Sequence, residues 1–254
     1  MAKPYLSPDS FRFFAHRGLT VGRDGQTFDE NSQPAFEAAL EAGATHLEVD
    51  VRASRDGVSV ICHDETLLRV AGQDSRVADL DWAELSAISL LNGSRLMSLE
   101  QLLALYETAK VNIDIKSTDA AEPTAEVIVR LKAHDRVLVS SFSEKRRAAT
   151  VALLPGIATS GSASQLLKTW LAHKLGSKTL LGRTLVGLDA LQIPTSRGPL
   201  RFDSEKFISA VKAFGVEIHY WTINDPGQAR TLRARGANGV VSDRIDLIIA
   251  ALAE

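Results

Sequence analysis

Short apolar runs alternate with helical patterns along this chain, and no other feature of the sequence limits its fold as strongly. Candidate strands are 13–15, 46–51, 58–62, 111–115, 137–139, 157–159, 188–193, 217–221 and 239–242. Between most of them, apolar residues return at helical spacing, as in SLEQLLALYET and SEKFISAVKAFG. Parallel strands need long crossover connections that are usually helices, so this alternation indicates a parallel sheet.

The number of these units favours a closed (β/α)8 TIM barrel, which is an α/β fold. The chain has 254 residues, and barrels of this kind typically have roughly 250. We therefore predict a single domain over residues 1–254. The irregular stretch 67–97 is expected to form a short insertion after the second barrel strand. An open, doubly wound sheet stays an alternative, because periodicity does not reveal whether a sheet closes.

Charge balance and cysteine count limit the partners and the location. A net charge of −2 and a pI near 6.3 disfavour nucleic acid and anionic membrane surfaces as partners. Cys62 is the only cysteine, so no intrachain disulfide can form. No segment approaches the roughly 20 apolar residues of a membrane span, and the N-terminal stretch lacks the apolar core of a signal peptide. We expect a cytoplasmic protein with a small-molecule substrate, and its oligomeric state stays open.

Two carboxylates point the same way from the second barrel strand. Residues i and i+2 of a strand share a face, so Glu48 and Asp50 lie opposite the apolar residues that alternate with them. They are expected to face the barrel axis near the carboxyl end of the strand, where active sites of this fold form. Buried neighbouring carboxylates repel each other unless they are neutralised. A divalent cation such as Mg²⁺ or Ca²⁺ would do this, and pairing with arginine or lysine is the alternative.

The next long strand repeats this pattern with Asn112, Asp114 and Lys116. Asp114 is a candidate third oxygen ligand for the cation. Lys116 is a candidate point charge for a phosphate oxygen. An ion pair between Asp114 and Lys116 on an exposed strand end is the alternative, and the apolar neighbours argue against full exposure.

A histidine follows each of two strands, His16 in HRG and His63 in HD. Phosphodiester cleavage needs one group to accept a proton from the nucleophile and another to protonate the departing alkoxide. Histidine can do both near neutral pH, because its unperturbed pKa is about 6.5. Metal ligation by either histidine stays an alternative. Arg17 carries a planar guanidinium that suits bidentate contact with a phosphate.

The other histidines and the cysteine are expected to be structural. His46 lies deeper than Glu48 on the same face and is expected in the core. His219 shares a face with Trp221 and could line the pocket. Cys62 points away from His63, since neighbours in a strand face opposite sides, so a Cys–His nucleophilic pair is not expected.

Taken together, these motifs make the chain similar to the glycerophosphodiester phosphodiesterases. The matching segments are AHRG (15–18), EN (30–31), LEVDV (47–51), DGVSVICHDETL (56–67), NIDIK (112–116), SSF (140–142), WTIND (221–225) and GANGVVSDRID (236–246). They span nearly the whole chain. HRG, E-x-D and HD in this order are a highly specific combination.

The resemblance implies a TIM barrel that hydrolyses glycerophosphodiesters to sn-glycerol 3-phosphate and an alcohol with the help of a divalent cation, Mg²⁺ or Ca²⁺. By position, His16 and His63 match the family's acid/base pair. Glu48 and Asp50 match two metal ligands, and Asp114 stands in the place of the third. Substrate contacts are expected from Arg17, Glu30, Asn31, Lys116 and Trp221. Whether Glu30 contacts the metal or the substrate stays open.

Two departures from the family pattern leave the substrate and the products open. Asp114 stands where the family commonly has glutamate, and related sphingomyelinase D-like phospholipases also use aspartate there. A phospholipase D-like lyase acting on lysophospholipid or sphingolipid head groups is therefore an alternative. The segments LLRVAG (67–72) and LMSLEQ (96–101) also differ, in a region that caps the site in the family. A barrel that binds phosphorylated metabolites without turnover is a further alternative, against which the paired histidines argue.

Overall fold

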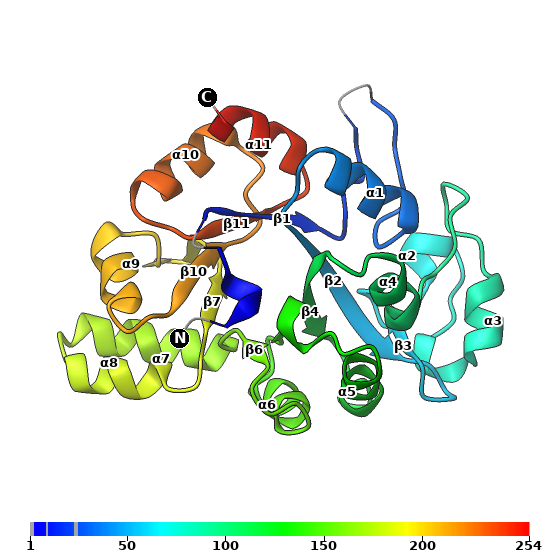
Figure 1. Cartoon of the computed structure of the whole chain (residues 1–254), viewed down its shortest axis with the longest axis horizontal. Helices are drawn as coiled ribbons and strands as arrows, with labels where there is room; N and C mark the ends of the chain where they lie inside the picture. The colour runs from blue at the N-terminus through cyan, green and yellow to red at the C-terminus, as the bar shows by residue number, and fades with distance from the viewer. Residues whose placement is uncertain (1–2, 9, 23–24, 254) are drawn as a thin grey trace.

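Eight parallel strands form a barrel in the computed structural model, which describes residues 3–8, 10–22 and 25–253. The strands are β1 (Arg12–His16), β2 (His46–Ala53), β4 (Lys110–Ile115), β5 (Val137–Ser140), β6 (Ala158–Thr159), β7 (Ala190–Ile193), β10 (Glu217–Tyr220) and β11 (Gly239–Ser242). Their order is β6-β5-β4-β2-β1-β11-β10-β7, and a parallel bridge between Ser160 and Ala190 joins the two ends of the sheet. Figure 1 shows the strands around one axis. The predicted TIM barrel is confirmed in place of the open sheet.

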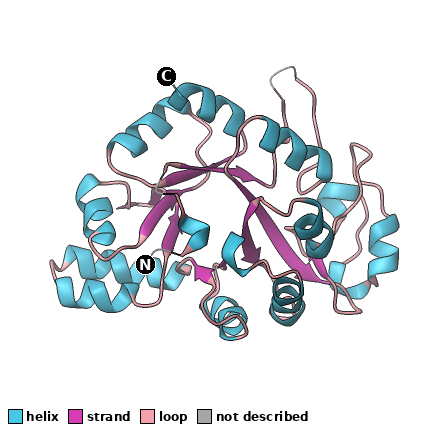
Figure 2. Cartoon of the chain, in the orientation of Figure 1, coloured by secondary structure: helices cyan, strands magenta, loops and turns pink. Residues whose placement is uncertain are grey.

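Helices surround the barrel and connect its strands (Figure 2). They are α1 (Gln33–Glu41), α4 (Leu99–Leu105), α5 (Ala121–Arg130), α6 (Glu144–Ala152), α7 (Ala163–Lys174), α8 (Lys178–Leu185), α9 (Glu205–Lys212), α10 (Pro226–Ala234) and α11 (Ile245–Ala253), with a 3-10 turn η3 (His134–Arg136). The start of α1 is as predicted: Ser32 caps it by accepting a hydrogen bond from the backbone N–H of Ala35. Among the described residues, no helix combines the length and the apolar character needed to cross a membrane.

Alternate side chains of the barrel strands belong to two different cores. The outward residues Leu47 and Val49 of β2 are fully buried in a large apolar core between the barrel and its helices. Inward residues such as Phe14 and Leu138 form a smaller core inside the barrel. This inner core fills the part of the barrel nearer the amino-terminal ends of the strands, and polar side chains occupy the axis nearer the carboxyl ends.

Charged side chains close the amino-terminal end of the barrel. The 3-10 turn η1 (Pro4–Leu6) covers this end, and Lys110 donates hydrogen bonds to three backbone carbonyls in and next to it. Arg12, which is 2% exposed, binds both carboxylate oxygens of Glu217 at 2.6 Å. Burial alone would raise the pKa of Glu217, but hydrogen bonds from Arg12 and His219 outweigh it and hold the pKa at about 2. The carboxyl end is therefore the open mouth of the barrel.

The irregular stretch after β2 is an insertion with its own small core. It follows β3 (Ser59–Ile61), which pairs antiparallel with β2 and stands outside the barrel. The insertion carries α2 (Leu68–Ala71), the 3-10 turn η2 (Val77–Asp79) and α3 (Trp82–Ala87). Its core contains Val60, Cys62, Leu67, Val77, Leu85, Leu90 and Leu96. The strand predicted at 58–62 is present, and it folds back on β2 instead of entering the barrel.

Candidate active site

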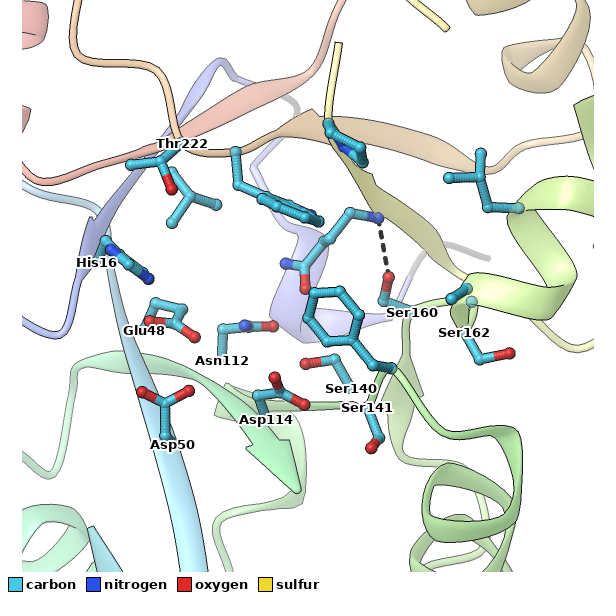
Figure 3. Close-up of a pocket in the computed structure, with 18 of the residues that line it drawn as sticks. His16, Glu48, Asp50, Asn112, Asp114, Ser140, Ser141, Ser160, Ser162 and Thr222 are labelled. Carbon is cyan, nitrogen blue, oxygen red and sulfur yellow. Dashed lines mark hydrogen bonds between the residues drawn. The ribbon is translucent and has the colours of Figure 1, made fainter. Parts of the chain in front are cut away.

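The register of β1, β2, β4 and β5 arranges the predicted site residues in two layers. His16, Glu48 and Asn112 are register partners in the lower layer. Asp50, Asp114 and Ser140 are partners in the layer nearer the mouth. Figure 3 shows these side chains converging from their strands. The alternation of polar and apolar residues thus places the carboxylates on the barrel axis, as the sequence indicates.

A pocket of about 720 Å³ opens at this end of the barrel. The predicted site residues that line it are His16, Arg17, Glu48, Asp50, His63, Asp114, Lys116 and Trp221. Within the described ranges, Glu30 and Asn31 do not line it. They lie behind it: Glu30 accepts hydrogen bonds from Arg17, and the Asn31 amide lies 3.5 Å from Asp50. The structure therefore brings together eight of the ten predicted residues and places the other two in contact with them.

A tight turn after β1 places Arg17 in the pocket. Arg17 has φ +57° and Gly18 has φ +85°. A Cβ atom on Gly18 would lie 2.7 Å from the Cβ of Ala35, so only glycine fits this approach of the turn to α1. Asn31, at φ +55°, donates its backbone N–H to the carbonyl of Arg17 at 2.9 Å. The HRG and EN motifs thus form one turn structure that holds the arginine.

Three carboxylates and two cationic side chains form a compact buried cluster. Nζ of Lys116 lies 2.9 Å from Asp50 and 2.6 Å from Asp114. Nε of Arg17 lies 3.0 Å from Oδ2 of Asp50, although outside hydrogen-bond geometry. Cation pairing, the alternative left open by the sequence, is therefore present for both aspartates. The Asp114–Lys116 pair is buried, not on an exposed strand end.

The three carboxylates of the cluster are not stabilised equally in their charged form. Burial, together with the neighbouring Asp50, raises the pKa of Glu48 to about 7. Burial also raises the pKa of Asp114, despite its contact with Lys116. Burial alone would raise the pKa of Asp50 too, but Lys116 and Arg17 outweigh it and lower that pKa. Arg17 and Lys116 pair with the two aspartates. Among the described residues, Glu48 is therefore the carboxylate of the cluster without an ion pair, and the charge of nearby His16 only partly offsets the rise in its pKa.

The donor set fits a hard divalent cation in its chemistry. Among the residues that the structure describes, Oδ1 of Asp114 is buried without a hydrogen-bond partner, and the one hydrogen bond of the Glu48 carboxylate is a 3.3 Å contact with the backbone N–H of Arg17. Carboxylate oxygens are the ligands that Mg²⁺ and Ca²⁺ prefer. In the described part of the chain, however, no group of three or more His, Cys, Asp and Glu side chains stands in an arrangement that could hold a metal ion. Lys116 instead bridges Asp50 and Asp114.

His16 is oriented by an aspartate from the last strand–helix connection. Its Nδ1 lies 2.6 Å from Oδ1 of Asp243, and Oδ2 of Asp243 accepts a hydrogen bond from the Asn224 side chain at 2.8 Å. Burial alone would lower the pKa of His16, but the Asp243 hydrogen bond and the charge of Glu48 outweigh it and raise the pKa. His16 is therefore stabilised in its protonated form and has Nε2 left to face the pocket.

His63 has a similar partner close to it in the sequence. Its Nδ1 lies 2.6 Å from Oδ1 of Asp64, whose other oxygen accepts from Nε of Arg69 at 2.5 Å. The two terminal nitrogens of Arg69 bind both oxygens of Glu30 at 2.7 Å, and Glu30 accepts from Arg17 at 3.2 Å. A continuous chain of charged groups, in which Arg69 of the insertion is the middle member, therefore connects His63 to Arg17.

The residues expected to be structural are buried away from the pocket. His46 is 2% exposed and packs between Tyr5 and Phe14. His219 is fully buried and pairs with Glu217. It therefore lies nearer the amino-terminal end of the barrel than the pocket does, and it does not line the pocket as its shared face with Trp221 had allowed. Burial raises the pKa of the Cys62 thiol to about 12, which makes it a poor nucleophile.

Asp243 and Arg69 are site residues that the sequence did not reveal. Asp243 lies 227 positions from His16, so no local pattern connects them. It follows β11 directly, and a carboxylate at the carboxyl end of a predicted barrel strand was the one available signal. Arg69 lies in the insertion, where the sequence pattern was irregular.

Comparison with known proteins identifies relatives along nearly the whole chain. The profile of the glycerophosphoryl diester phosphodiesterase family matches residues 16–247. A Mycobacterium tuberculosis protein, named as a probable glycerophosphodiester phosphodiesterase 2, is 38% identical over 235 residues, which cover 92% of this chain and 88% of the relative.

Solved structures of similar proteins have the same fold. A glycerophosphodiester phosphodiesterase from Thermotoga maritima superposes with a TM-score of 0.72 and 26% identity, covering 94% of this chain and 97% of the other. A phosphodiesterase from Oleispira antarctica, solved with its product sn-glycerol-3-phosphate, superposes with a TM-score of 0.76 and 24% identity, covering 96% and 97%.

Proposed function

This chain belongs to the glycerophosphoryl diester phosphodiesterase family, and we propose on this basis that it hydrolyses glycerophosphodiesters to sn-glycerol 3-phosphate and an alcohol. One observation carries the proposal: His16 and His63 line the same pocket as the carboxylate cluster. Each histidine has Nδ1 bound to an aspartate, which leaves Nε2 for proton transfer with the substrate. Sn-glycerol-3-phosphate is also the product bound by the Oleispira antarctica relative.

In this proposal the phosphate is bound by the cationic side chains and by a cation that the carboxylates would hold. Glu48, Asp50 and Asp114 would hold a divalent cation, Mg²⁺ or Ca²⁺, which as a Lewis acid withdraws charge from a non-bridging phosphate oxygen. Arg17 and Lys116 would contact the other phosphate oxygens and stabilise the charge that develops during attack. Trp221 lines the wall next to this position and would pack against the organic part of the substrate.

The two histidines would share the proton transfers. His63 would accept the proton of the attacking hydroxyl, which we assign to the 2-hydroxyl of the glycerol. His16, held in its protonated form by Asp243 and Glu48, would donate a proton to the departing alkoxide. The P–O bond to the alcohol breaks as the new P–O bond forms, giving a cyclic phosphate. Water would then open the ring with the two histidines in exchanged roles.

Phosphorus NMR of the reaction tests this proposal and its rivals. We expect purified protein with Mg²⁺ to convert a glycerophosphodiester to the monoester sn-glycerol 3-phosphate, with a cyclic phosphate only as a transient signal. A cyclic phosphodiester that accumulates as the final product would indicate the lyase. No product from any glycerophosphodiester, together with binding of the substrate, would indicate a non-catalytic barrel.

Replacing Asp243 with asparagine tests the assignment of His16 as the acid. A hydrogen bond to a charged group is worth roughly 1.5–3 kcal/mol, so kcat should fall by roughly 10- to 100-fold. Because Asp243 raises the pKa of His16, its loss lowers that pKa, and the alkaline limb of the pH–rate profile should move to lower pH. Asp225→Asn is the matched control, since asparagine can still cap α10. An unshifted limb would contradict the assignment.

A further inference from the structure

The pocket has two unlike halves. The three carboxylates, on β2 and β4, occupy one side with Arg17 and Lys116. The other side is built from β5, β6, β7 and the loops that follow them. Figure 3 shows Ser160 and Ser162 across the pocket from Glu48 and Asp50. A pocket of about 720 Å³ lies well within the roughly 300–1,000 Å³ of sites for drug-sized ligands, so this second half has room for the alcohol portion of a diester.

Hydroxyl and amide groups are set among apolar residues in the second half, such as Phe142 and Leu166. The polar uncharged residues that line it are Ser140, Ser141, Ser160, Ser162, Gln192 and Ser196. Ser160 accepts a hydrogen bond from the backbone N–H of Gln192 at 2.9 Å and is fully buried. Ser140 and Ser141 already donate to the backbone carbonyls of Ile113 and Ile115, so their oxygens are left to accept, whereas the O–H of Ser160 is left to donate. Such a wall suits a ligand with several hydroxyl groups of its own.

The one charged residue described in this half is cationic. Arg197 lies on the hairpin of β8 (Ser196–Arg197) and β9 (Leu200–Arg201) and lines the pocket. Within the part of the chain that the structure describes, its guanidinium makes no ion pair. The described lining residues include no Asp or Glu other than Glu48, Asp50 and Asp114, and two of these already bind Lys116. A positively charged alcohol would therefore meet Arg197 without a carboxylate of its own.

The aromatic pair at the mouth does not make this half of the pocket suited to a cation. Phe142 and Trp221 stand edge to face with ring centroids 5.4 Å apart, and aromatic faces attract cations. However, Nζ of Lys116 already lies 5.6 Å from the centroid of the Phe142 ring. The Phe142 ring of the pair therefore already has a cation beside it.

We propose that this pocket selects diesters of a polyhydroxylated alcohol, preferably one with a further negative charge, over diesters of cationic amino alcohols, and that Arg197 sets this preference. The inference rests on the proposed hydrolysis of glycerophosphodiesters and specifies its substrate class. The serine-lined wall binds the hydroxyl groups, and Arg197 binds the additional anionic group. Arg197 comes from the hairpin of β8 and β9 and has no part in the proposed proton transfers or phosphate contacts, so we class it as a specificity residue and not a catalytic one.

Three substrates separate the preferences: glycerophosphoinositol 4-phosphate, glycerophosphoglycerol and glycerophosphocholine. We expect kcat/KM to fall in that order, by at least about tenfold from first to last, a difference of about 1.4 kcal/mol. Cleavage of glycerophosphocholine as fast as the other two would overturn the inference and leave the proposed function intact. If none of the three is cleaved, the proposed function itself is wrong, and the inference falls with it.

The Arg197→Gln variant tests the specificity residue. It should lower kcat/KM for the phosphorylated substrate by about tenfold, to the level of glycerophosphoglycerol, because a charge-assisted contact is lost. The uncharged glycerophosphoglycerol should change by less than about twofold, glycerophosphocholine should be cleaved faster because the repulsion is removed, and Arg197→Lys should retain part of the preference. Arg183→Gln, on the exposed surface of α8, is the matched control. An equal loss on all three substrates would assign Arg197 a general structural role and overturn the proposal.

Discussion

Replacing His16 or His63 with alanine is expected to lower kcat by about a thousandfold, because general acid–base catalysis contributes roughly 10²- to 10⁴-fold. Both side chains line the pocket and are partly exposed, His16 at 22% and His63 at 34%. Their removal therefore leaves no large cavity in the core, and the protein should stay folded. Steady-state kinetics on a glycerophosphodiester, with circular dichroism and thermal unfolding of each variant, would measure both effects.

The double variant His16→Ala/His63→Ala makes the test decisive. If the histidines act as a pair, it should be little worse than either single variant, since residues that act as a unit are not additive. His134→Ala, in η3 outside the pocket, is the control and should keep full activity. A double variant with substantial activity would rule out both histidines as the acid and base.

Removing divalent cations is expected to abolish activity, by about a thousandfold or more. A Lewis acid at the phosphate contributes several kcal/mol, and each 1.4 kcal/mol corresponds to about tenfold. EDTA should stop turnover, and an excess of Mg²⁺ or Ca²⁺ should restore it. Cation binding can also be measured through stability. A cation at about 100 times its dissociation constant stabilises the folded state by about 2.7 kcal/mol, which should raise Tm by roughly 5–11 °C.

Variants of the carboxylates separate metal binding from catalysis. Asp114→Asn should lose both the activity and the cation-induced rise in Tm, whereas His16→Ala should lose the activity and keep the rise. Asp135→Asn, an exposed aspartate in η3, is the matched control. Full activity in EDTA would contradict the proposed cation, and the Lys116–carboxylate cluster would then bind the phosphate without it.

The barrel and the inward carboxylates were predictable because they depend on local patterns. Two-residue periodicity placed Glu48 and Asp50 on one face, and the register with β4 then brought Asp114 beside Asp50. The capping of α1 by Ser32 was equally local. The fold-back of β3 on β2 was not predicted, although the five residues that join the two strands are too few for a parallel crossover and so indicated an antiparallel pair.

The missing parts of the site come from contacts between distant segments. No pattern around Asp243 indicates that it orients His16, because the contact exists only when β11 lies beside β1. Local sequence patterns also could not decide whether a divalent cation or basic side chains neutralise the carboxylates. It depends on where the Lys116 side chain lies, and the structure pairs Lys116 with both aspartates. Sequence spacing predicts which side chains share a face of a strand, but it does not predict which charged side chains from different strands pair with one another.

The contact between the first and last strands has a consequence for synthesis of the protein. A ribosome adds roughly 5–20 residues per second, so β11 emerges tens of seconds after β1. Until then β1 has no partner on one side, His16 lacks Asp243, and Arg12 lacks Glu217 for most of that time. Activity should therefore appear only after β11 has been synthesised. A chain released early would keep both histidines and all three carboxylates without assembling them into a working enzyme.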